Sequence, residues 1–159
     1  MLICLLFVCT SLLAQDVEIP NNLKLENTED YNKTEQLVLN STTWLLNTPI
    51  TENTNKRKEI NAFLIKWMTG SPTVTIDLVS GIVPLDSTDC LISFMSGWTK
   101  YSIENNYSGN KIECALAGAK NAIEFYTKNK LELGKNSNME KLIKQHKKRK
   151  LKKYIETKF

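Results

Sequence analysis

The sequence lacks the residues and motifs on which most enzymes depend. It has a single histidine, His146, which lies in a lysine-rich stretch. There is no GxSxG nucleophile elbow, no HExxH zinc motif, no glycine-rich phosphate loop and no EF-hand spacing. Zinc is further disfavoured, because the two cysteines beyond residue 14 and one distant histidine fall short of four ligands at motif spacing. No cofactor and no catalytic residue are therefore assigned.

Acidic side chains offer only a weak case for catalysis. Asp86 and Asp89 lie three residues apart and could together hold a metal, but helix capping explains both more simply. Glu104, Glu113 and Glu124 are acids or bases by type, yet no spacing pairs them. A hydrolase with a carboxylate site that the sequence does not reveal stays an alternative.

Long hydrophobic runs are also missing, except at the amino terminus. Residues 1–14, MLICLLFVCTSLLA, are uncharged and apolar, and the polar QDVE follows at once. This run is short for a transmembrane helix, which needs about 20 residues, and suits a secretory signal of about 7–15 apolar residues ending at a small residue such as Ala14. We expect a signal peptide over residues 1–14 and an exported protein, periplasmic or secreted; a buried N-terminal helix is the alternative. The mature chain is expected to be soluble, with no transmembrane segment.

Most of the remaining chain has helical periodicity. Residues 15–27 show no sustained period, so we expect a flexible arm there. Apolar residues then recur at helical spacing over residues 28–47 and about 55–69, and Gly70 follows the second stretch as a stop signal. The next stretch, 72–80, is ambiguous, because Ser-Pro favours a helix start and TVTIDLV alternates like a strand. Without a convincing partner strand, we expect a short helix ending near Gly81.

Two helices with complementary faces follow. Thr88 or Asp89 is expected to cap the first, which has an apolar side. The second follows Asn110, which with Glu113 resembles a capping box. The second helix has a stripe of small residues: Cys114, Ala115, Gly118, Ala119 and Ala122. Because small side chains allow two helix backbones to approach closely, we expect this stripe to pack against the preceding helix at Ser93, Ser96 and Gly97.

The last helix is predicted to start at Ser137, which forms a capping box with Glu140. The sequence thus predicts an all-α fold, a compact bundle of five or six helices. The bundle should occupy residues 28–134, and a Lys-rich C-terminal helix should occupy residues 135–159.

Cys90 and Cys114 are the two cysteines of the mature chain. An even pair in an exported protein favours a disulfide. The predicted helices oppose it, since an antiparallel pair would place these residues about 18 Å apart and a disulfide allows a Cα separation of at most about 7 Å. A disulfide, within one molecule or between two, and a pair of buried reduced thiols both stay open.

The charge of the chain is strongly asymmetric. Residues 135–159 contain ten Lys or Arg and two acids, for a net charge of +8, whereas residues 1–134 have a net charge of −4. The run KQHKKRKLKK predicts either a solvated helix or a surface that docks onto an anionic partner. The candidate contact residues are Lys144, Lys147, Lys148, Arg149, Lys150, Lys152 and Lys153.

The kind of partner follows from the expected compartment. Export would remove nucleic acid as a ligand, although such charge suits it well. Lys147 and Lys150 interrupt the apolar side of the helix, whereas a membrane-surface helix needs an unbroken one. The partners left are an unknown protein or an anionic envelope component, such as lipid headgroups or acidic polysaccharide.

Two resemblances add to this interpretation. The SLLAQD junction and the Asn/Lys-rich helical body resemble uncharacterised small exported proteins of Gram-negative bacteria. CLISFMSGW, followed later by EC and AIEFYTKN within residues 90–129, resembles small periplasmic immunity proteins of type VI secretion. That resemblance implies a helical protein that neutralises a toxic effector by binding it, and no functional residue is carried over. We therefore expect a non-catalytic exported binding protein, with an immunity-type inhibitor as the alternative.

Overall fold

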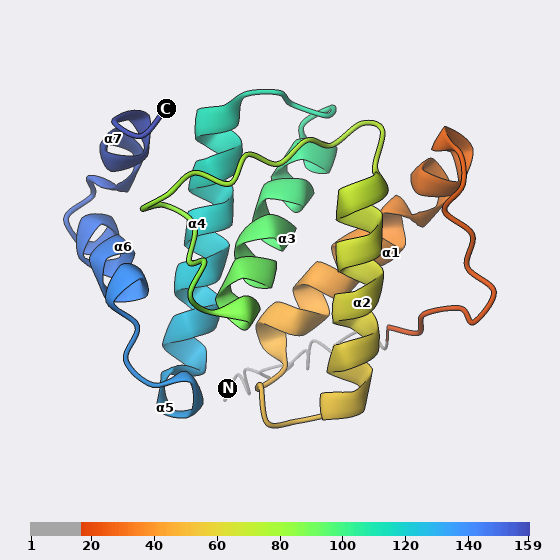
Figure 1. Cartoon of the computed structure of the whole chain (residues 1–159), viewed down its shortest axis with the longest axis horizontal. Coiled ribbons are helices and arrows are strands. Elements are labelled where there is room, and N and C mark those ends of the chain that lie inside the picture. Colours follow the sequence, from red (N-terminus) through yellow and green to blue (C-terminus); the bar gives the residue numbers. More distant parts are fainter. Residues whose placement is uncertain (1–16) are drawn as a thin grey trace, which may run out of the picture.

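The fold is all-helical, as predicted, in the residues that a computed structural model describes, 17–159 (Figure 1). The expected signal peptide lies outside these residues. None of the described helices has the length and hydrophobicity of a membrane span. The helices are α1 (Thr28–Asn47), α2 (Thr54–Gly70), α3 (Thr88–Glu104), α4 (Lys111–Lys128), α5 (Lys130–Leu133), α6 (Ser137–Lys147) and α7 (Leu151–Glu156).

The centre of the fold is the α3–α4 seam, the contact between these two helices, which is the most extensive between any two helices described (Figure 1). The predicted small-residue stripe lies in it. A Cβ atom added to Gly118 would stand 2.7 Å from the carbonyl oxygen of Phe94, and one added to Gly97 would stand 3.1 Å from the Cα of Gly118. Real Cβ atoms essentially never come within 3.0 Å of such an atom and seldom within 3.4 Å, so glycine permits the close approach of the two backbones. The predicted packing is confirmed.

The α1–α2 pair is held by polar contacts within an apolar interface. Trp67 donates from Nε1 to the hydroxyl of Thr34 at 2.9 Å. Arg57 is buried and donates to the carbonyl of Thr48 at 2.6 Å, just beyond the end of α1. A cation is favourable there because unpaired carbonyls leave that end of a helix negative. Burial lowers the pKa of Arg57, and the charge of Asp89 partly offsets the effect.

The segment 71–87, which we call the strap, contradicts the predicted short helix. Its only ladder contact is an isolated bridge between Ser80 and Val83, so it is not a regular strand either. Side chains elsewhere in the fold bond to two of its carbonyls: Trp98 donates from Nε1 to the carbonyl of Thr75 at 3.0 Å, and Tyr154 donates to that of Gly81 at 2.8 Å. Of the alternating residues, Val74 is buried and Ile76 partly buried, whereas Leu78 is 50% exposed. Further along the strap, Ile82 and Val83 are buried without a neighbouring strand.

Residues 17–27 have no helix, and their apolar side chains contact the bundle. Val17 is only 3% exposed. Ile19, Leu23 and Leu25 pack against the core as partly buried residues. This end of the described chain therefore lies on the bundle in an irregular conformation.

The predicted single C-terminal helix is wrong in two respects. The chain forms α6 and α7, separated at residues 148–150 by a turn in which Arg149 has a φ of 56°. In addition, Asn136 caps α6 in place of Ser137, since its Oδ1 accepts the backbone N–H of Met139 at 2.9 Å. The predicted capping box fails because the Glu140 carboxylate bonds to other side chains.

The N-caps of α3 and α4 can likewise be compared with the residues predicted for them. Ser87, and not the predicted Thr88 or Asp89, caps α3 through a 3.5 Å contact with the N–H of Cys90. Asn110 caps α4 as predicted, accepting from the N–H of Glu113 at 3.2 Å.

Candidate functional site

The basic end is residues 135–159, which comprise α6, the turn and α7. Its helices are fixed to the bundle by an apolar underside. The buried side chains of that underside, each at most 3% exposed, are Met139, Leu142, Leu151 and Ile155. These anchors position the backbone from which the cations project.

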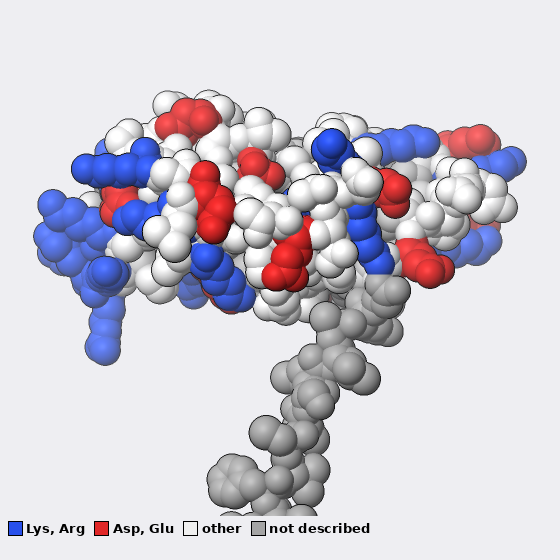
Figure 2. All heavy atoms as spheres, turned by 90° about the horizontal axis from the view of Figure 1, so that it is seen from below, with Lys and Arg blue, Asp and Glu red and all other residues white. Residues whose placement is uncertain are grey.

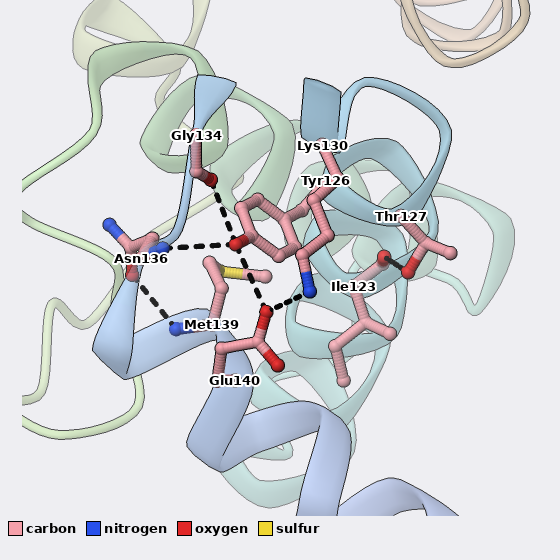
Figure 3. Close-up of polar contacts among 8 residues, drawn as sticks. All are labelled: Ile123, Tyr126, Thr127, Lys130, Gly134, Asn136, Met139 and Glu140. Atoms are coloured by element: carbon pink, nitrogen blue, oxygen red, sulfur yellow. Dashed lines mark hydrogen bonds and ion pairs between the residues drawn. The ribbon is translucent and has the colours of Figure 1, made fainter. Parts of the chain in front are cut away.

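A buried hydroxyl ties the start of α6 to α4 (Figure 3). The Tyr126 hydroxyl accepts the backbone N–H of Asn136 at 2.9 Å. It donates to the carbonyl of Gly134 at 3.0 Å or to the carboxylate of Glu140 at 3.2 Å. Lys130 forms an ion pair with the same carboxylate, and its hydrogen bond holds the pKa of Glu140 below the ordinary value. We call Tyr126, Lys130 and Glu140 the polar hub.

A second set of contacts fixes α7. Besides its hydrogen bond to the strap, Tyr154 has Lys141 and Lys158 over its ring, at 5.1 and 5.5 Å from the centroid. Lys152 pairs with Glu113 of α4 at 2.5 Å, and this bond raises the pKa of Lys152.

All seven candidate cations are exposed. Apart from Lys152, none of them forms an ion pair with a described residue. Figure 2 shows Lys and Arg side chains gathered at one end of the molecule, on the left, where Figure 1 places α6 and α7. Acidic side chains are scattered over the body. The sequence prediction therefore identified a real cluster, whose charge the fold leaves largely uncompensated.

An open groove of about 540 Å³ runs beside α6. Its lining residues are Lys135, Glu140, Ile143, Lys144, Lys147 and Lys148. Lys135 was not among the predicted contact residues, although it belongs to the basic run. Glu140 was predicted only as part of a helix cap, and no pattern in the sequence indicates that it lines the groove.

The two aspartates proposed as a metal pair are not brought together. Asp86 lines a polar pocket of about 460 Å³ at the start of α6, and it accepts from the side chain of Asn138 at 3.3 Å. The hydrogen bond from Asn136 is the main reason that the pKa of Asp86 is lowered. Asp89 lines a separate, much smaller cavity next to Arg57. Across residues 17–159, no group of three or more His, Cys, Asp or Glu side chains could hold a metal ion.

The remaining catalytic candidates are also dispersed. Glu104 pairs with Lys100 and Glu124 with Lys128, each within its own helix. Glu113 is held by Lys152. His146 is exposed near the end of α6. These side chains converge on no common pocket in the described structure.

The two cysteines are free and buried, and they are not bonded to each other. Each sits in the first turn of its helix, Cys90 in α3 and Cys114 in α4. The Cys114 thiol contacts the carbonyl of Ser108 at 3.4 Å. Burial raises the pKa of both thiols, which disfavours the reactive thiolate. Of the two predicted arrangements, the structure has the pair of packed thiols.

Comparisons with protein families, curated proteins and solved structures gave no match to this chain.

Proposed function

We propose that this is a non-catalytic binding protein that attaches to an anionic partner through its basic end. One observation carries the proposal: six exposed cations have no acidic partner in the described chain, while buried side chains fix the helices that bear them. Exposed lysine side chains that no neighbouring residue holds in place are suited to attracting a surface with many negative charges. They are less suited to catalysis, which needs a side chain held against one reacting bond.

The energetics favour this role over that of an ordinary solvated helix. The cations of residues 135–159, which have a net charge of +8, repel one another. The net charge of −4 on the other residues is scattered and offsets little of this repulsion locally. Lys144 of α6 and Lys148, the C-cap residue of that helix, stand four residues apart, a spacing at which like charges destabilise a helix slightly. The favourable position of cations at a helix C-terminus offsets only part of this repulsion. An anionic partner would relieve it, and the attraction should weaken as salt screens the charges.

The test is retention on an immobilised sulfated polysaccharide, with the salt concentration at elution as the readout. The variant Lys144→Gln/Lys147→Gln/Lys148→Gln removes three charges of the basic end. The control Lys58→Gln/Lys66→Gln/Lys120→Gln removes three exposed charges of the body. Both variants have the same net charge, so they separate the position of the charge from its amount.

We expect the first variant to elute at clearly lower salt than the wild type, and the control to elute close to it. Equal shifts in the two variants would mean that net charge alone drives retention. That result contradicts the proposed function, and so does a wild type that binds neither the polysaccharide nor another anionic surface at low salt.

A further inference from the structure

We propose that the partner of the basic end is the anionic headgroup surface of a lipid bilayer, on which the molecule lies with α6 and α7 facing the lipid. This inference rests on the proposed function and names the partner of the same surface. Three features of the basic end support a lipid surface: its residue type, its shape, and the distribution of charge over the whole molecule.

The residue type favours a diffuse field of charge. Nine of the ten cations in residues 135–159 are lysine, and Arg149 is the exception. Lysine presents a compact point charge on a flexible stem, whereas arginine selects phosphate or carboxylate through a rigid pair of hydrogen bonds. Protein interfaces are depleted in lysine and enriched in arginine and aromatic residues. A lysine-rich surface therefore matches headgroups better than a single protein partner.

The aromatic side chains of the basic end argue against nucleic acid. Single-stranded nucleic acids bind to exposed rings on which bases stack. Tyr154 is only partly exposed, and Lys141 and Lys158 lie over its ring. Phe159, 47% exposed, is the one accessible large apolar side chain among residues 135–159. Apart from Phe159 and the imidazole of His146, no ring among residues 135–159 is exposed, so successive bases would find no series of rings on which to stack.

The shape of the basic end favours an extended partner. The turn at Arg149 places cations on α6, on α7 and at the corner between them. All seven are exposed, and the groove beside α6 is open, so no enclosed site surrounds a single small anion. The apolar anchors face the bundle and are not available for insertion. Attachment would thus be peripheral and reversible, unlike that of an amphipathic helix embedded in the interface.

The whole molecule is polarised as this orientation requires. In Figure 2 Lys and Arg side chains gather most densely at the left end, whereas the rest of the molecule carries charges of both signs; residues 1–134 have a net charge of −4. An anionic surface attracts the basic end and repels the net negative remainder, so it would orient the protein as well as hold it. Clusters of four to eight basic residues beside a membrane-spanning helix or on an amphipathic helix bind anionic lipid, and the basic end carries a cluster of at least this size on its exposed side.

The experiment is co-sedimentation with vesicles at low and high salt. Pure phosphatidylcholine vesicles are compared with mixed phosphatidylcholine–phosphatidylglycerol vesicles, using the wild type and the two triple variants described above. We expect binding only to the mixed vesicles, and loss of it at high salt. Each lysine contributes about a fivefold gain in partition to an anionic surface, so the Lys144/147/148 variant should lose about a hundredfold. The control variant should lose far less.

Parallel binding measurements with the soluble sulfated polysaccharide and with duplex DNA separate the alternatives. Wild-type protein that binds the polysaccharide but not the mixed vesicles overturns the lipid inference and leaves the proposed function standing. Tighter binding to DNA than to vesicles at the same salt also overturns it. Binding to none of the three overturns both. Circular dichroism of each variant ensures that a loss of binding is not a loss of fold.

Discussion

The α3–α4 seam and the basic end differ in how their residues are used. In α3, nine of 17 residues are buried, whereas in α6 only two of 11 are. The seam draws its stability from close backbone approach through Gly97 and Gly118, with few charges involved. The basic end depends on a few apolar anchors, on the polar hub and on the contacts of Tyr154 and Lys152, and its other cations are exposed. The first region thus builds the fold, and the second is free to carry binding.

The largest expected effect tests the anchors of the basic end. Leu142→Ala removes a side chain that is 1% exposed and should reduce the free energy of unfolding by about 2–3 kcal/mol. Hydrogen exchange should accelerate in α6 far more than in α3 and α4. Leu131→Ala is the matched control, because Leu131 is 94% exposed, and it should change stability by less than about 0.5 kcal/mol. Equal acceleration in all helices would show that the two regions are one cooperative unit.

The next effect tests the seam. In most helices, replacing glycine by alanine is stabilising. At Gly118 the added methyl group would meet the backbone of α3 at 2.7 Å, so Gly118→Ala should destabilise by about 1–3 kcal/mol. Gly109 has open space around its Cβ position, and Gly109→Ala should be nearly neutral in the same chemical denaturation assay. A stabilised Gly118→Ala protein would mean that the helices are further apart than described.

A smaller effect tests the polar hub. Tyr126→Phe leaves the N–H of Asn136 without its acceptor and should reduce stability by about 1 kcal/mol. The matched control is Tyr107→Phe, since Tyr107 is exposed and its hydroxyl bonds only to Glu35. Thermal unfolding of both variants gives the comparison. Equal losses in the two would remove any special role for the hub.

The smallest effect is a pH dependence. Lys130 lowers the pKa of Glu140 in the folded protein, so the pair adds stability above the ordinary carboxyl pKa and loses it as pH falls through the folded value. Melting temperatures of the wild type and Glu140→Gln should therefore differ most near neutral pH and converge between about pH 5 and pH 3. A gap that is constant over this range contradicts the assignment of the shift to this pair.

Sequence reasoning succeeded where local pattern decides the structure. Helical spacing and the small-residue stripe predicted the seam. Cys114 and Gly118 stand four residues apart, so on a helix they share one face, which can pack closely against a neighbouring helix. Helix lengths alone also indicated that Cys90 and Cys114 lie at opposite ends of that pair. The location of the cations was visible as well, since the basic residues are contiguous in the chain.

It failed where tertiary contacts outweigh local preference. Lysine and arginine are good helix formers, so nothing in KKRKLKK signals the turn at Arg149. That turn lets Leu151 and Ile155 reach the bundle and Tyr154 reach the strap. The sequence of the strap suggests a strand or a helix, but its actual path is irregular. That path depends on a hydrogen bond from Trp98, which is distant in the sequence. The polar hub was missed for the same reason.

The most direct test of the central claim, that the basic end binds and the seam does not, is an NMR titration. Backbone amide shifts of ¹⁵N-labelled protein are followed as a soluble sulfated oligosaccharide is added. We expect shift changes centred on residues 141–153, with α3 unaffected. Changes centred instead on the polar pocket at Asp86, or spread over the lysines of the body, would contradict it.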